Sequence, residues 1–159
     1  MGGGKVIQPL NSALEVGIRV VAMLTALYPQ AADLSRIVLL DYAVLHSGDF
    51  NGELSLHPNI PGRVGELSVK RGLVEDGVQL MGLRGLVVRK NTEHGIYYSA
   101  SDDALPFLES IDSSYLNRLR DRCLWAAQSF GDRSEEEVRT QLNEVFGLWA
   151  EEFDDVQIP

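Results

Sequence analysis

Apolar positions along the chain recur mainly every three or four residues, a pattern that predicts a largely helical protein. A first helix is expected to begin at Ser12, because its spacing to Glu15 is that of a capping box, and to end just before Pro29. A second helix is expected from its N-cap Asp33 to about His46. The first third of the chain is therefore predicted to be a pair of helices.

A loop, a long helix and a β-hairpin are predicted next. Residues 50–62 contain glycines and prolines that favour a loop, and the third helix is expected from Arg63 to a stop at Gly85. Glycines inside this helix each cost up to about 1 kcal/mol. Either another helix approaches its backbone closely or the segment is kinked. The pattern then predicts a hairpin that pairs residues 86–89 with 96–100 around a turn at 91–95.

More helices are predicted after the hairpin. One short helix should run from residue 101 or 102 to about 111, and a second, capped by Ser113 or Ser114, should end at Gly131. Helices followed directly by a hairpin are typical of a winged helix. The predicted fold is therefore mainly α with a small β-hairpin: a winged helix-turn-helix-like domain over residues 10–130 followed by additional helices, with an acidic amphipathic C-terminal helix and tail over residues 131–159.

The last predicted helix runs from about residue 135 to 153 and starts with a second capping box, Ser134 and Glu137. Its apolar residues fall on one stripe and its acids on the other side; the stripe consists of Val138, Leu142, Val145, Phe146, Trp149 and Phe153. Two interpretations remain open. The stripe docks in a partner's groove, or it closes the protein's own core.

The size of the chain favours a single domain, and its single cysteine favours the cytoplasm. A chain of 159 residues is normally one domain, and Cys123, the only cysteine, cannot form an internal disulfide. The most apolar stretch, residues 13–27, contains Glu15 and Arg19 and is shorter than the roughly 20 residues that span a bilayer. We therefore expect no membrane insertion.

Charge is unevenly distributed within a net charge of −9. Residues 134–159 carry eight acids and one base, whereas residues 63–90 carry six bases and three acids. The bases suit either phosphates or the acidic face of a protein partner. The candidate partner-binding residues here are Arg63, Glu66, Lys70 and Arg71, together with Val138, Leu142, Phe146, Trp149 and Phe153 of the stripe. The alternative interpretation of Arg63 is an ordinary solvent-exposed side chain at the start of the third helix.

Direct DNA contact is expected to be weak, because affinity for phosphates depends on several neutralised charges. The candidate nucleic-acid contacts are Arg84, Arg89 and Lys90.

No arrangement of reactive residues stands out. His46, His57 and His94 lack metal-ligand spacing, and no phosphate-binding loop motif occurs, so we expect no metal, no cofactor and no enzymatic activity. Asp41, His46 and Asp49 could cluster around the turn after the second helix, but the favoured explanation is local: such residues cap helix ends and bind loop backbone N–H groups. A hydrolase built on His46, Ser47 and Asp49 is the least favoured alternative, because no orienting group is evident.

Five stretches of the chain resemble the middle component of ABC-three-component systems. They are LLDYAVLHSGDF (39–50), SLHPNIPGRVGEL (55–67), VKRGLVEDGVQLMGLRGLV (69–87), GIYYSA (95–100) and PFLESIDSSYLNRLRDRCLW (106–125), and the resemblance covers about residues 11–128. It implies a non-enzymatic accessory subunit that binds an SMC-like ABC ATPase and couples it to an effector, commonly a nuclease, as in Lamassu-type anti-phage defence. The alternative function is a stand-alone winged-helix transcription regulator.

Overall fold

The structure is a computed structural model that describes residues 12–46, 56, 63–131, 133, 134, 136, 137, 140 and 144, and only the backbone of residues 63–68. Its elements, in chain order, are α1 (Ala13–Leu27), α2 (Leu34–Leu45), α3 (Arg63–Leu83), β1 (Val87–Thr92), β2 (Gly95–Ala100), α4 (Ala104–Glu109) and α5 (Ser114–Phe130). The protein is therefore mainly helical, with one two-stranded antiparallel sheet, as the sequence predicts.

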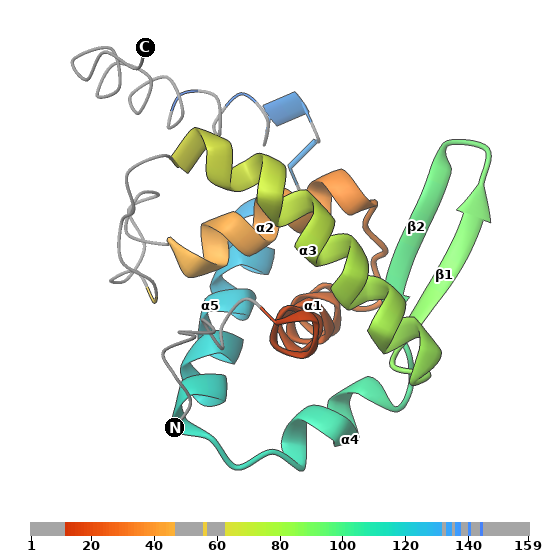
Figure 1. The fold of residues 1–159 in the computed structure, drawn as a ribbon. Helices are drawn as coiled ribbons and strands as arrows, with labels where there is room; N and C mark the ends of the chain where they lie inside the picture. The colour runs from red at the N-terminus through yellow and green to blue at the C-terminus, as the bar shows by residue number, and fades with distance from the viewer. Residues whose placement is uncertain are drawn as a thin grey trace, which may run out of the picture.

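Helix α1 lies at the centre of the molecule. It packs against α2, α3, α4, α5 and β2, and Figure 1 shows it almost end-on between α3 and α5. Its apolar side chains point in several directions, which suits a helix covered on most sides. Val16, Val20, Val21 and Leu24 are fully buried and form the middle of the core.

Helices α1 and α3 cross at two glycines. A Cβ atom added to Gly77 would lie 2.8 Å from the backbone nitrogen of Gly17, and one added to Gly17 would lie 2.7 Å from the side chain of Met81. The two backbones therefore touch, which only glycine permits. Of the two explanations that the sequence left open for the glycines of α3, close approach by another helix is confirmed at Gly77.

Local capping sets the helix starts. Ser12 Oγ accepts a hydrogen bond from the N–H of Glu15, and Asp33 Oδ1 accepts one from Arg36, at 3.2 and 2.8 Å. Ser113 Oγ caps α5 in the same way, so the two predicted helices of the first third and the start of α5 are confirmed. The short helix α4 begins later than predicted, at residue 104, and its N-cap makes no side-chain hydrogen bond.

Helix α3 ends in a turn that turns the chain into the hairpin. Gly85 has a φ of +74°, and the N–H groups of Gly85 and Leu86 donate to the carbonyls of Gly82 and Met81. This is the Schellman pattern, in which glycine at the left-handed position satisfies the last helical carbonyls. The predicted helix stop at Gly85 is confirmed.

The hairpin is longer than predicted. Its strands pair from Val87↔Ala100 to Thr92↔Gly95, so the turn contains only residues 93 and 94 rather than 91–95. The polar residues near the tip look like turn residues in sequence, but their backbones pair across the strands. At its base, Tyr98 exchanges two backbone hydrogen bonds with Ala32, at 2.8 and 2.9 Å, which ties β2 to the segment before α2.

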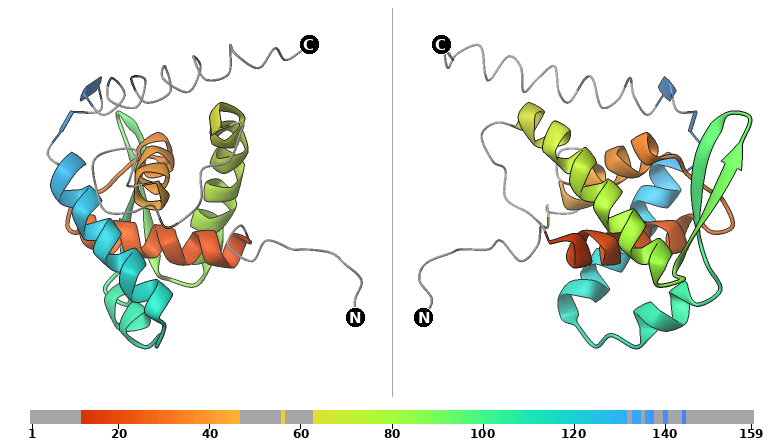
Figure 2. Two further views of the ribbon diagram at one scale, coloured as in Figure 1. Left: turned by 90° about the vertical axis from the view of Figure 1, so that its left-hand side faces the viewer. Right: turned by 45° about the vertical axis from the view of Figure 1, so that its right-hand side comes forward.

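The end of α5 is fixed to the start of α2. Arg36 Nη2 donates to the carbonyl oxygens of Phe130 and Arg133, at 2.6 and 3.0 Å. The cation thereby meets the negative end of the helix dipole of α5. In the left view of Figure 2, α2 lies above α1 and between α5 and α3. The division into residues 10–130 and 131–159 stays a prediction.

Within the described part of the chain, no helix combines the length and the apolar character that crossing a membrane requires.

Candidate functional site

An ion cluster of three residues lies inside the helical core. Asp41 of α2 is fully buried and accepts hydrogen bonds from Arg19 Nε at 2.9 Å and Lys70 Nζ at 2.7 Å. Arg19 and Lys70 are 3% and 5% exposed, and they come from α1 and α3. One carboxylate thus joins the three helices and carries two cations.

The charges in this cluster favour the ionised carboxylate. Burial alone would raise the pKa of Asp41, but the charges of Lys70 and Arg19 and their hydrogen bonds outweigh burial and hold the pKa well below its usual range. Burial likewise opposes the charge of Arg19, yet Asp41 keeps the pKa of its guanidinium above the ordinary value. The expectation that Asp41 caps a helix end or serves the following turn is therefore wrong: its partners are tertiary.

The candidate partner-binding residues of α3 have different locations. Lys70 points inward, and its ammonium pairs with Asp41 inside the core, where it does not face a partner protein. Arg71 is exposed and donates to Ser35 Oγ at 3.1 Å. Arg63 begins α3, but its side chain and that of Glu66 lie outside the described residues. Their predicted roles stay predictions.

The described surface of α3 is not basic. Its exposed charged residues, with the one that follows the helix, are Arg71, Glu75, Asp76 and Arg84, two of each sign. The candidate nucleic-acid contacts Arg84, Arg89 and Lys90 are all exposed, and Arg89 and Lys90 point to opposite faces of β1. The positive residues therefore do not gather on one described face of the helix.

Of the described residues considered for chemistry, His46 and Cys123 are internal and His94 is exposed. His46 is fully buried and stacks on Tyr42 with ring centroids 4.4 Å apart. Cys123 is buried in the core, where burial raises the pKa of its thiol. Ser47, Asp49 and His57 lie outside the described residues. Among the residues that are described, no three histidine, cysteine or acidic side chains gather as a metal ion would need.

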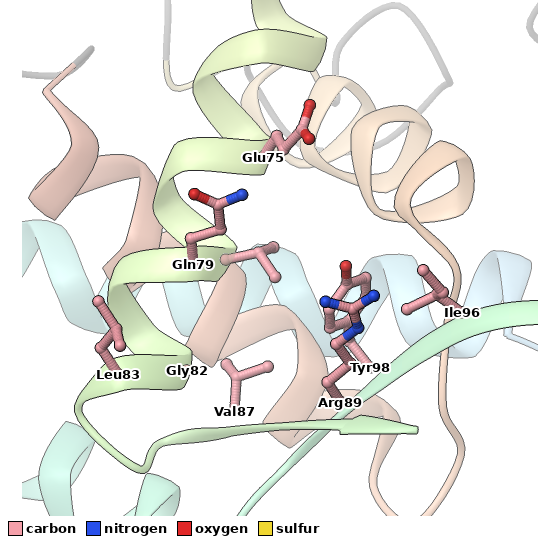
Figure 3. A pocket seen from close by; sticks show the side chains of 9 residues that line it. Glu75, Gln79, Gly82, Leu83, Val87, Arg89, Ile96 and Tyr98 are labelled. Atoms are coloured by element: carbon pink, nitrogen blue, oxygen red, sulfur yellow. The ribbon is translucent and has the colours of Figure 1, made fainter. Parts of the chain in front are cut away.

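An open groove lies between α3 and the hairpin (Figure 3). We call it the hairpin groove; its volume is about 590 Å³, and α3 contributes Glu75, Val78, Gln79, Gly82 and Leu83 while the strands contribute Val87, Arg89, Ile96 and Tyr98. Cross-strand pairing of Arg89 with Tyr98 and of Asn91 with Ile96 places these strand residues on the same face of the hairpin. The volume falls in the range of roughly 300–1,000 Å³ typical of ligand sites.

Large apolar side chains line this groove and remain accessible. Leu83 is 88% exposed and Ile96 is 40% exposed, whereas Val78 and Val87 form a buried floor. Tyr98 packs partly against the core, and Tyr97, which points to the opposite face of β2, is also only partly exposed. The groove thus combines accessible apolar side chains with a charged residue at each side, Glu75 on α3 and Arg89 on β1.

Sequence reasoning missed both the groove and the ion cluster. An arginine and an aspartate in otherwise apolar helices, Arg19 and Asp41, were the available signal for a buried ion pair. Leu83 next to the helix stop was the corresponding signal for the groove, because an apolar residue there has no predicted internal partner.

The C-terminal segment is described only at a few positions. Ser134 Oγ accepts a hydrogen bond from the N–H of Glu137 at 3.1 Å, which is one half of the predicted capping box. Glu136, Glu137, Thr140 and Glu144 are helical and exposed. The apolar stripe, Val138, Leu142, Val145, Phe146, Trp149 and Phe153, lies outside the described residues. Its role in docking or in the core stays a prediction.

The fold and the site define a class: a small, mainly helical protein with a salt-linked core and an open apolar groove beside its hairpin. The chain belongs to the family described as ABC-three component (ABC-3C) system Middle Component 2, whose sequence profile matches residues 9–152. The predicted family resemblance is thereby confirmed, and it extends into the acidic C-terminal segment. No curated protein and no solved structure matches the chain.

Proposed function

We propose that this chain is a non-enzymatic accessory subunit of a cytoplasmic bacterial anti-phage defence complex. In this role it binds an SMC-like ABC ATPase, as in Lamassu-type systems, and links that ATPase to an effector, most simply a nuclease. The observation that carries the proposal is the family match over residues 9–152, because a middle component of a three-component system acts with other components.

Three features of the described residues support a binding role. The hairpin groove leaves apolar side chains, Leu83 and Ile96 above all, accessible to a partner. The polar residues that could react, Asp41 and His46, are engaged inside the core. The order α1, α2, α3 and hairpin also supports a winged-helix-like unit, a fold that serves protein contacts as well as DNA binding.

Co-expression with the neighbouring genes tests the proposal. We expect the chain to elute from size exclusion in one stable complex with the ATPase and the effector, and ATP hydrolysis to appear in the complex but not in the isolated chain. A chain that always elutes alone contradicts the proposal. A chain that turns over a substrate by itself contradicts its non-enzymatic part.

The alternative is a stand-alone winged-helix transcription regulator, favoured by the helix-then-hairpin order. Its expected recognition helix, α3, carries Lys70 paired internally and exposed charges of both signs, which speaks against a phosphate-binding surface. Binding to the chain's own promoter region at about 50 mM salt decides the matter, since phosphate contacts are strong at low salt. Tight, salt-dependent binding supports the regulator, and no measurable binding excludes it.

A further inference from the structure

We infer that the hairpin groove receives an amphipathic helix of the ATPase component, which lays large apolar side chains over Val78, Val87 and Tyr98 and brings a carboxylate to Arg89. The inference rests on the proposed function, because it names the surface through which the proposed subunit contacts its ATPase. The occupant is defined by its chemistry: a helical segment with an apolar stripe and an acidic residue beside it.

The apolar character of the groove points to an apolar occupant. Val78 and Val87 on its floor are buried, and Leu83 and Ile96 above them are exposed to water. Helices that dock in grooves bury side chains of this kind at i, i+3 or i+4, and i+7. The α3 wall runs from Glu75 to Leu83, and the eight steps between these residues at 1.5 Å each give about 12 Å, or two turns of a helix lying alongside.

Gly82 leaves room for a helix at this wall. Gly77 is explained inside the chain, because α1 touches it, but Gly82 has no such contact: a Cβ atom there would come no closer than 4.0 Å to any neighbour. Gly82 is exposed and lines the groove. Gly82 lies in the last turn of α3, and the absence of a side chain there lets a second backbone come within reach. Together with the apolar walls, this favours a helix lying against α3.

The charges at the sides of the groove specify the occupant further. In Figure 3, Glu75 lies on α3 and Arg89 on β1, at different sides of the opening. Among the described residues neither side chain has an ion-pair partner within 4 Å. An acid opposite Arg89 and a base opposite Glu75 would orient the incoming helix, because rim charges set register and approach rate. Arg89 can also hold a carboxylate with two parallel hydrogen bonds.

The first experiment compares two apolar residues on opposite faces of the same hairpin. Ile96→Asp changes the groove face, and Val88→Asp is the matched control, since Val88 is 45% exposed against 40% for Ile96. Affinity for the purified ATPase component is measured for both variants, with thermal melting to confirm that each is folded. We expect Ile96→Asp to weaken binding roughly thirtyfold or more, as loss of an interface hot spot does, and Val88→Asp to bind as the unchanged chain does.

The second experiment fills the groove without removing a contact. Gly82→Gln places a side chain at the α3 wall, and Gly72→Gln is the control, because Gly72 is exposed on the same helix with nothing within 4 Å of its added Cβ. Both changes should leave folding intact or improve it, since glycine is the poorer helix former. We expect only Gly82→Gln to reduce ATPase binding.

The third experiment tests the acidic residue of the occupant. Arg89→Glu should weaken binding by about tenfold, and Lys90→Glu, on the opposite face of β1, should have little effect. A compensating change of an acid to arginine in the ATPase helix should restore binding of the Arg89→Glu variant and of no other variant.

The outcomes separate the two proposals. If the unchanged chain does not bind the ATPase component, the proposed function fails. If it binds and Ile96→Asp, Gly82→Gln and Arg89→Glu bind equally well, the groove inference is overturned and the proposed function stands. If the variants lose binding to the ATPase component only where they also lose affinity for DNA, the inference that a protein helix occupies the groove is likewise overturned.

Discussion

Asp41 neutralises two cations in the core, where water does not solvate them. Its carboxylate is fully buried between Arg19 and Lys70, with hydrogen bonds of 2.9 and 2.7 Å. Removing one member of a buried ion pair leaves an uncompensated charge, and this typically costs about 3–5 kcal/mol. A single aspartate therefore links α1, α2 and α3, and its loss is expected to destabilise their packing.

Asp41→Asn should lower the free energy of unfolding by about 3–5 kcal/mol, because Arg19 and Lys70 would stay buried without a counter-charge. Urea unfolding followed by circular dichroism measures the change. The control is Asp76→Asn, which removes an exposed carboxylate from α3 and should shift the free energy by less than about 0.5 kcal/mol. Equal unfolding midpoints for the two variants would contradict the proposed importance of the cluster.

The pH dependence of stability follows from the same residue. The pKa of Asp41 in the folded protein lies below its ordinary value of 3.8, so the unfolded chain takes up the proton first as the pH falls. The stabilisation is thus complete above about pH 5 and is lost as the pH drops below about 4, toward the folded pKa. Unfolding free energies between pH 3 and 7 should decline more steeply in acid for the unchanged chain than for Asp41→Asn. Parallel curves would show that another group is responsible.

The α1–α3 crossing depends on the absence of two side chains. Gly77→Ala would place a Cβ atom 2.8 Å from the backbone of Gly17, and backbone cannot move aside cheaply. We expect a loss of about 1–3 kcal/mol in unfolding free energy, as for overpacked cores. Gly72→Ala on the same helix meets nothing within 4 Å and should instead gain up to about 1 kcal/mol. Thermal denaturation of the two variants measures the change. Melting temperatures that both rise or both fall would contradict this prediction.

Helix starts and stops were predictable from the sequence because they depend on neighbouring residues. Ser12, Asp33 and Ser113 each bond an N–H three residues ahead, and Gly85 takes the left-handed conformation that ends α3. The length of the hairpin was not predictable in the same way. Whether Asn91 and Thr92 belong to a turn or a strand depends on pairing with Ile96 and Gly95.

The candidate site required the tertiary structure. Arg19, Asp41 and Lys70 are each more than twenty residues apart, and local sequence does not reveal which acid neutralises which base. For that reason Lys70 reads as a surface cation until α2 is placed beside it. The groove combines Leu83 at the end of one element with Ile96 in another, so neither residue predicts it alone.

At the scale of the whole molecule, one described surface and one predicted surface are candidates for partner contact. One is the hairpin groove, built from described residues; the other is the predicted stripe of the C-terminal segment, which includes Trp149 and Phe153 and falls mostly within the family match. We expect Trp149→Ala with Phe153→Ala to weaken complex formation while the melting temperature of the isolated chain stays unchanged, because aromatic residues dominate docking contacts. Glu151→Ala with Glu152→Ala is the control. A collapse of the melting temperature would assign the stripe to the chain's own core.

Combining the two surfaces tests whether they bind separate parts of the complex. If Ile96 contacts the ATPase helix and Trp149 a different surface, the losses in binding free energy from Ile96→Asp and from the Trp149 and Phe153 double change should add within about 0.5 kcal/mol. If the stripe of a second copy of the chain instead occupies the groove, the combined variant should lose little more than either parent. Calorimetric titration of all three variants against the ATPase component together with the effector distinguishes these cases. Additive losses would mean that the groove and the stripe contact the complex independently, as the proposed bridging role requires.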